Sequence, residues 1–326
     1  MDSYLPLYLF TLALSLVACA LILKNIIPRL KRLAPQPILT EGPHWHSSKY
    51  GTPTMGGISF LFTGALCAII AVASLMRSGA KDEAISLLTV IGYATLSGLI
   101  GVIDDLTKLR HRENAGLSPK AKLILQSLCA IAFLFARAKL LSEGTSLYFS
   151  FGSFDIGPLY YILAFIMLIA TVNCANLTDG VDGLASGVAF AIGICLFYIS
   201  FSARADVAVM SVIEIGISLA FLFFNLNPAR IFMGDTGSLY FGAILGGCAI
   251  CLGNPLLAMI LGSVYLIEGV SVIIQVAVYK LTSRRVFRMA PIHHHFERLG
   301  FSENRIVIAF MLVTLLSSLL CPILFL

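Results

Sequence analysis

Charged residues are scarce in this sequence. Only 12% of its 326 residues are Asp, Glu, Lys or Arg, whereas 58% are hydrophobic; soluble domains carry roughly 25% charged residues. This shortage excludes an ordinary soluble domain. The net charge of +5 comes from loops between apolar runs and not from one basic domain, so no nucleic-acid partner is expected. The composition predicts an integral membrane protein surrounded by membrane lipids.

Strand-like alternation of apolar and polar residues is also absent, which argues against a membrane β-barrel. No basic stretch or small-residue cleavage pattern precedes Leu5, so the first apolar run is expected to be a retained helix. We predict an all-α protein with a single polytopic domain over residues 1–326 and about ten transmembrane helices. The expected spans are 5–27, 56–76, 84–103, 121–141, 158–177, 184–201, 207–226, 238–253, 256–279 and 304–325.

Positive charge is nearly missing from one set of the predicted loops. That set holds only Arg77, Lys81, Arg137, Lys139 and Arg204, and all other Lys and Arg residues fall on the opposite side. Cytoplasmic loops carry the excess of Lys and Arg. Both termini are therefore expected outside the cytoplasm, with the polar clusters described below at the cytoplasmic face.

Familiar phosphate and metal motifs are missing too. The run from Ser47 to Gly57 lacks the GxxxxGK[ST] pattern of a P-loop, although Lys49 among glycines and hydroxyls suits an anion-contacting loop. A membrane-entry turn is the alternative. Cys248 and Cys251 have CxxC spacing but no second pair, so we expect them to pack in the apolar interior.

Acidic residues, although few, gather at particular places. Asp104 and Asp105 follow each other at the predicted end of a span, where they oppose the helix dipole and repel each other unless a cation lies nearby. Lys108 can pair with Asp104 across one helical turn. This arrangement favours a site for Mg²⁺ and phosphate over its alternative, a salt-bridged loop in solvent.

Two more polar clusters occupy equivalent positions between apolar runs. One is NLTDGVDGLA at 176–185, and the other is FMGDTGS at 232–238. Glycines there allow sharp turns and close approach to a ligand. The alternatives are ordinary loop chemistry for the first cluster and a helix cap for Asp235.

A third polar region combines a membrane helix with the last predicted cytoplasmic loop. Glu268 and Gln275 share a helical face and can line a cleft, whereas Glu214 has no such companion. The loop carries PIHHHFE at 291–297. Adjacent histidines point apart and do not easily bind one metal, so they suit a pyrophosphate better.

These motifs together resemble the polyprenyl-phosphate N-acetylhexosamine-1-phosphate transferase superfamily over essentially the whole chain. The triple histidine followed by Phe-Glu is similar to its phospho-N-acetylmuramoyl-pentapeptide transferase branch. The resemblance implies Mg²⁺-dependent transfer of phospho-MurNAc-pentapeptide from UDP-MurNAc-pentapeptide to undecaprenyl phosphate, with release of UMP. It also implies a role in bacterial peptidoglycan synthesis, a place in the cytoplasmic (inner) membrane and a homodimer.

The resemblance also implies residue roles at the reacting phosphates. Asp235 is expected to bind Mg²⁺, Asp104 to deprotonate or position the lipid phosphate, and Asp105 to support that group or the metal. The phosphate- and nucleotide-contacting positions would be Lys49, Lys108, Lys120 and Asn176.

Further roles concern the nucleoside and sugar. The expected uridine pocket comprises Asp179, Asp182 and Phe232, with Asn225 and Gln275 lining the same cleft. His293, as a catalytic group, and its neighbours His294 and His295 would address the pyrophosphate and sugar. Sequence leaves open whether an aspartate forms a phospho-enzyme or the lipid phosphate attacks directly, and direct attack is preferred.

Two rival functions remain at this stage. A related transferase that uses UDP-GlcNAc would share most of the acidic motifs. A secondary transporter would also carry polar groups and glycine-broken helices, although its binding site would lie at the midplane of the bilayer and not at loop ends.

Overall fold

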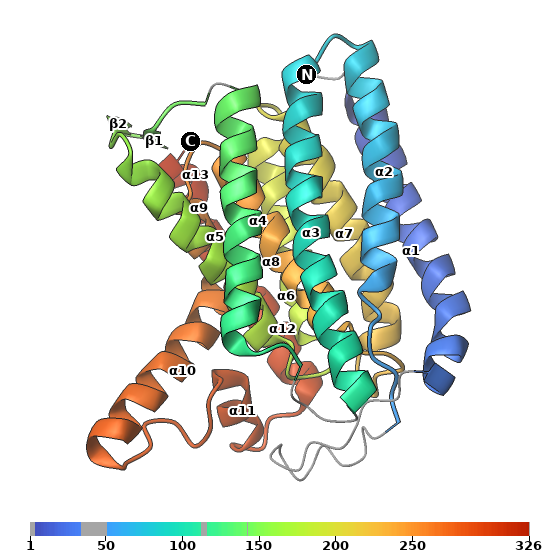
Figure 1. Cartoon of the computed structure of the whole chain (residues 1–326), viewed down its shortest axis with the longest axis vertical. Coiled ribbons are helices and arrows are strands. Elements are labelled where there is room, and N and C mark those ends of the chain that lie inside the picture. The colour runs from blue at the N-terminus through green and yellow to red at the C-terminus, as the bar shows by residue number, and fades with distance from the viewer. Residues whose placement is uncertain (1–3, 34–50, 112–115, 142, 326) are drawn as a thin grey trace.

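The computed structural model describes residues 4–33, 51–111, 116–141 and 143–325. They form long helices that run side by side, with both chain ends at one end of the bundle (Figure 1). The long helices are α1 (Leu5–Leu33), α2 (Ile58–Arg77), α3 (Lys81–His111), α4 (Pro119–Leu140), α5 (Leu159–Thr178), α6 (Leu184–Ser200), α7 (Ala205–Asn225), α8 (Gly234–Cys251), α10 (Ser263–Thr282) and α12 (Glu303–Ser318). Three short helices are α9 (Leu257–Leu261), α11 (Ile292–Glu297) and α13 (Leu320–Phe325).

Eight helical stretches of the described chain are long and apolar enough to cross a membrane. They comprise α1 to α5, α7, α10 and the stretch Glu303–Phe325 that contains α12 and α13. The protein is thus a multi-pass helical membrane protein, as the composition predicts. The ten-span count includes α6, which has 17 residues, and the glycine-rich α8, so that count stays a prediction.

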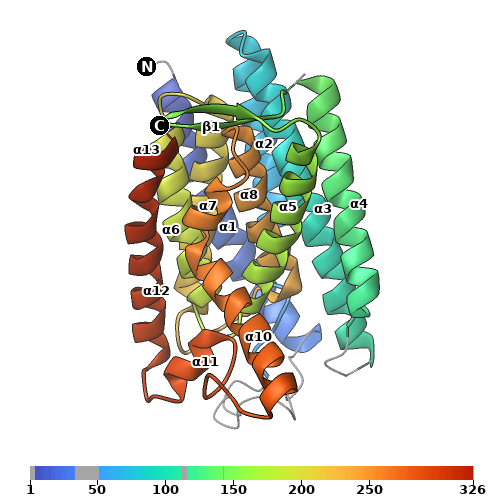
Figure 2. The same ribbon diagram turned by 90° about the vertical axis from the view of Figure 1, so that its left-hand side faces the viewer.

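Two predicted features need correction. The expected span 256–279 is broken between α9 and α10 at Gly262. The structure is consistent with the all-α class, but the prediction lacks a short hairpin in which β1 (Ser146–Phe149) pairs antiparallel with β2 (Gly152–Asp155). The hairpin lies beyond the ends of α4 and α5 (Figure 2), where backbone groups outside the bilayer do not have to be satisfied within a helix.

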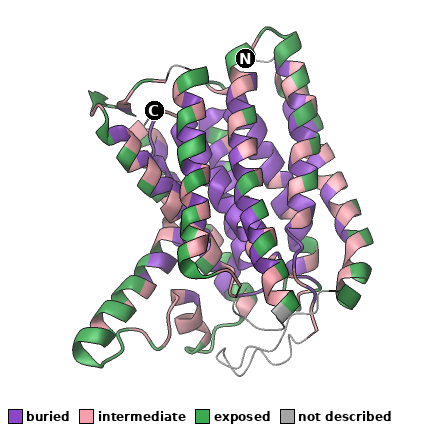
Figure 3. Ribbon diagram, in the orientation of Figure 1, coloured by how far each residue is buried: buried purple, intermediate pink, exposed green. Residues whose placement is uncertain are grey.

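Helix α8 forms the centre of the bundle. All its residues from Thr236 to Cys251 are buried, and it packs against α3 and α5. A Cβ added at Gly242 would lie 2.6 Å from the Cα of Val172 on α5, so this glycine allows the two helices to pack closely. Exposed residues lie on the outer helices and buried ones at the centre (Figure 3). Large apolar side chains such as Phe62 and Phe135 are exposed, as expected of a surface that faces lipid.

Candidate active site

Three carboxylates converge at the end of the bundle away from the chain ends. Asp104 and Asp105 lie near the end of α3, and Asp235 lies in the first turn of α8. One oxygen of each lies within 4.8 Å of the others. Asp104 and Asp105 are 2% and 3% exposed. Carboxylate oxygens are the ligands that Mg²⁺ prefers, so this group fits a divalent cation, as the sequence predicts.

The start of α8 is built around Asp105. This carboxylate accepts hydrogen bonds from the backbone N–H groups of Asp235 and Thr236, both at 3.1 Å, and from the Thr236 hydroxyl at 2.7 Å. It therefore caps α8 from a neighbouring helix. Gly234 has φ +69°, and a Cβ there would collide with the Asp105 carboxylate. These contacts explain the Met-Gly-Asp-Thr order of the motif.

Two lysines reach the same cluster. Lys108 Nζ lies 2.7 Å from Asp104 Oδ2 and 3.0 Å from Asp235 Oδ1, and Lys122 pairs with the other Asp235 oxygen. Lys120, the residue selected from sequence, is exposed. Lys122 was missed, although its position four residues before the buried Gln126 puts it on the inward face of α4.

The cluster keeps an excess of negative charge. Its three carboxylates face two ammonium groups, and Asp104 accepts one more neutral bond from the Leu117 N–H at 2.9 Å. Asp179, which ends α5, lies close enough to the cluster for the negative charge of Asp105 and Asp235 to act on its carboxyl group. Removal from water, together with repulsion by Asp235 and Asp105, raises the pKa of Asp179 to about 8. Extra positive charge, from a metal ion, would relieve this repulsion.

The loops beside the cluster are tied together by two buried side chains. Asp182 Oδ2 accepts hydrogen bonds from Asn227 Nδ2 and the Ala229 N–H, at 3.1 and 3.0 Å. Asn225 accepts from the Gly183 N–H at 2.9 Å and donates to the Ile231 carbonyl at 2.8 Å. Both side chains therefore join the 179–183 loop to the 226–231 loop. Their expected contact with a nucleotide remains a prediction.

The segment before α8 also pairs with the segment before α2. The Phe232 N–H donates to the Pro53 carbonyl, and the Gly56 N–H donates to the Phe232 carbonyl, both at 2.8 Å. These bonds fix the backbone of Phe232 while its ring stays half-buried. Asn176 donates to Ser238 at 2.8 Å, so it lies beside the same helix start. Lys49 falls outside the described residues.

The three histidines have different partners, but the ring centroids of His293 and His294 lie 4.1 Å apart, so the prediction that neighbouring histidines point apart is wrong for this pair. His293 is fully buried against Glu268. His294 Nδ1 lies 2.5 Å from Glu297 Oε2, and His295 accepts a hydrogen bond from the Arg288 N–H. Gln275 accepts from the N–H groups of residues 286 and 287. It therefore supports the loop that leads to the histidines, and its predicted contact with substrate is untested.

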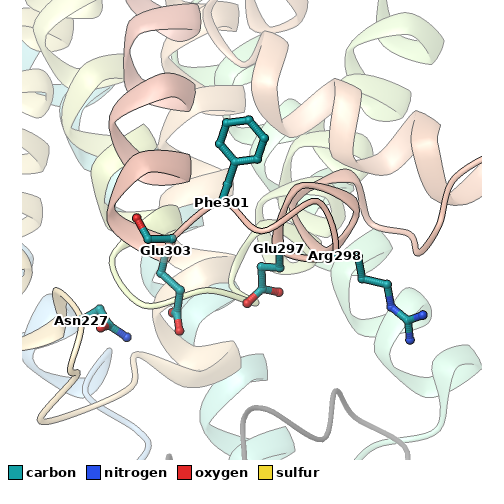
Figure 4. Close-up of a pocket in the computed structure, with 6 residues that line it drawn as sticks. Asn227, Glu297, Arg298, Phe301 and Glu303 are labelled. Carbon is teal, nitrogen blue, oxygen red and sulfur yellow. The ribbon is translucent and has the colours of Figure 1, made fainter.

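A polar hollow of about 300 Å³ opens beside these histidines, between the loop at Asn227 and the start of α12 (Figure 4). The side chains that line it supply two carboxylates, a guanidinium and an amide. The lining residues are Asn227, Glu297, Arg298, Phe301, Ser302 and Glu303. Glu303 also accepts a hydrogen bond from the Asp182 N–H at 2.8 Å. Such a lining suits a polar ligand and not an acyl chain.

Comparison with known proteins agrees with this geometry. Residues 87–253 match the model of glycosyl transferase family 4, a stretch that contains all three clustered carboxylates. A phospho-N-acetylmuramoyl-pentapeptide-transferase from Caldicellulosiruptor bescii is 38% identical over 96% of this chain and 95% of its own length. Proteins of the same name from Clostridium acetobutylicum and Bacillus velezensis are 41% and 40% identical, over 92% and 96% of both partners.

The matches thus extend well beyond the acidic motifs. They run through the histidine loop, which lies outside the region of the family model. Full-length similarity at this level, together with the shared family model, places the chain in glycosyl transferase family 4, among the phospho-N-acetylmuramoyl-pentapeptide-transferases.

Proposed function

We propose that the protein transfers phospho-MurNAc-pentapeptide from UDP-MurNAc-pentapeptide to undecaprenyl phosphate. The products are undecaprenyl-diphospho-MurNAc-pentapeptide (lipid I) and UMP, a step of peptidoglycan synthesis. The observation that carries this proposal is the cluster of three carboxylates and two lysines at one end of the bundle. Phosphoryl transfer needs charge neutralisation and alignment more than covalent work by the protein.

The bond changes follow from the substrates. An oxygen of the lipid phosphate attacks the phosphorus that carries the sugar, and the bond from that phosphorus to the oxygen of the uridine phosphate breaks. Asp104, Asp105 and Asp235 are the residues that would hold Mg²⁺, which would supply positive charge against the negative charge that develops on the phosphates. Asp104 is the group we expect to take a proton from, or orient, the attacking phosphate, because Asp105 is already committed to the start of α8.

The lysines supply the remaining positive charge. Lys108 and Lys122 both lie against Asp235, so either ammonium group can turn to a phosphate once a metal ion holds the carboxylates. Direct attack by the lipid phosphate needs no covalent enzyme intermediate, and we prefer it for that reason. Phe232 and the 179–183 loop are proposed to hold uridine, and the histidine loop the diphosphate and sugar.

We further propose that the carboxylate end faces the cytoplasm, in the cytoplasmic membrane of a bacterium. The excess of lysine and arginine in the loops at this end supports this orientation. At that face a soluble UDP-linked substrate would meet the lipid phosphate, which is held in the membrane. We treat residues 1–326 as one domain and expect a homodimer, the state implied by the family. Because the chain belongs to a transferase family, no observation now favours the alternative function of a secondary transporter.

The deciding experiment uses purified protein in detergent with undecaprenyl phosphate and Mg²⁺. UDP-MurNAc-pentapeptide and UDP-GlcNAc are added in parallel, and UMP release is followed. UMP from the muramoyl substrate alone is the expected result. UMP from UDP-GlcNAc would favour the related transferase and contradict the role given to the triple histidine. No UMP from either substrate, with folded protein, would overturn the proposal.

A further inference from the structure

Two glutamates lie inside membrane helices, and they differ in their surroundings. Glu268 on α10 is 0% exposed, and its Oε1 lies 3.1 Å from Nδ1 of His293, which is also 0% exposed. Its Oε2 accepts from the His293 backbone N–H at 3.5 Å. Glu214 on α7 is equally buried, but neither of its oxygens has a hydrogen-bond partner among the described residues.

The opposite side of the His293 ring meets the loop between α5 and α6. A Cβ added at Gly180 would overlap Nε2 of the ring and lie 2.8 Å from Cε1. The ring is therefore held between a carboxylate from the membrane helix and the backbone of Gly180. Any side chain larger than hydrogen at Gly180 would push the ring away.

This contact connects three elements that are far apart in sequence. Glu268 belongs to α10, His293 lies in the first turn of α11, and Gly180 lies between Asp179 and Asp182. A carboxylate inside a membrane helix is costly unless it is paired, and an apolar residue would fill the same space. The pair with His293 therefore indicates a positional role for Glu268.

We propose that Glu268 is a positioning residue that acts through His293 to hold the 179–183 loop in place for the nucleotide. Glu268 itself touches no substrate. Because Oε1 lies 3.1 Å from Nδ1 and Oε2 accepts from the His293 backbone N–H, the carboxylate holds His293 in place, and the Nε2 edge of the ring lies against the loop at Gly180. This inference rests on the proposed function, because that function assigns the loop to the nucleotide.

The test compares Glu268→Ala and Glu268→Gln with the matched control Glu214→Gln. Steady-state rates are measured with UDP-MurNAc-pentapeptide and undecaprenyl phosphate varied separately. Glu268→Ala is expected to raise the KM for the nucleotide substrate by about 10- to 100-fold, because small misplacement of a binding loop has effects of this size. The KM for undecaprenyl phosphate should change less than about twofold on the same argument.

The other variants sharpen this result. Glu268→Gln keeps the shape of the side chain and its contact with the imidazole, so it should recover most of the lost affinity. Glu214→Gln should leave both KM values unchanged. The double variant Glu268→Ala/His293→Ala should be no worse than His293→Ala alone, because both changes break the same contact.

Several outcomes would overturn the inference. They are an unchanged nucleotide KM in Glu268→Ala, an equal rise in both KM values, or additive effects in the double variant. If Glu268→Ala does not fold, Gly180→Ala displaces the ring from the other side and must show the same selective rise. Failure of the proposed function is distinguishable, since the unaltered protein would then release no UMP.

Discussion

Two charged networks occupy opposite ends of the bundle, and only one of them resembles an active site. At the end near the chain termini, Arg137 forms a two-point ion pair with Glu143 and also donates to Ser86 and Thr89, both at 3.0 Å. Arg204 pairs in the same way with Asp206. At the other end, three carboxylates crowd around two lysines.

The difference is charge balance. Two arginines match two carboxylates in the first network, and hydrogen bonds through Ser86 join the two pairs. In such a network every charged group has a partner of opposite charge, and the network stabilises helix packing. The second network gathers one carboxylate more than it has cations, which has an electrostatic cost that a bound metal ion would remove. Charge imbalance in a buried cluster therefore indicates function better than charge itself does.

The largest expected effect comes from Asp235→Asn. This change keeps the shape of the side chain but removes a charge that metal and lysines share, so turnover should fall by about 10²- to 10³-fold or more. UMP release measures the loss, and thermal unfolding checks that the protein stays folded. Asp82→Asn, on an exposed residue at the other end of α3, is the control. Near-normal turnover in Asp235→Asn would remove this residue from the site.

The next effect concerns the two lysines at the start of α4. Lys122→Met should lower turnover by about 10- to 100-fold, since a charge-assisted contact worth about 1.5–3 kcal/mol is lost at the reacting phosphates. Lys120→Met should change turnover less than about twofold, because exposed charges contribute little. Rates with saturating substrates decide between them. The reverse ranking would show that Lys120, and not Lys122, turns toward substrate.

Arg137→Met tests the balanced network. It leaves Glu143 without its partner and removes bonds to Ser86 and Thr89, so the free energy of unfolding should fall by about 1.5–3 kcal/mol. Turnover per folded molecule should not change. Lys139→Met, an exposed neighbour in the same helical turn, should leave thermal unfolding unaltered. Lost turnover without lost stability in Arg137→Met would contradict the division between the two networks.

Much of the site could be predicted from sequence because polar residues stand out in apolar surroundings. Asp104, Asp105 and Asp235 are conspicuous for that reason, and the structure brings all three together.

Other features depend on side-chain direction, which sequence does not give. Lys120 and Lys122 lie two residues apart on α4, so their side chains face different sides of the helix. The sequence does not tell which of these sides faces the carboxylates. Oδ2 of Asp182 and the amide of Asn225 are engaged by groups of the neighbouring loops, and their predicted contact with a nucleotide is untested. The β hairpin could not be predicted because each strand has only four residues, too few for an alternating pattern to stand out.

The smallest predicted effect depends on pH. The pKa of Asp179 lies at about 8, so this group is mostly neutral at pH 7 and mostly ionised at pH 9. Ionisation adds negative charge to the loop proposed to hold uridine, near the diphosphate of the same substrate, so the affinity for UDP-MurNAc-pentapeptide should fall about two- to fivefold across this range. Asp179→Asn mimics the neutral form and should keep its affinity at pH 9. Calorimetry without lipid substrate measures both proteins, and an equal decline in both would assign the pH effect to another group. A decline in affinity confined to the unaltered protein would instead show that the excess negative charge of the cluster acts on Asp179 in the neighbouring loop. The balanced arginine network has no such excess.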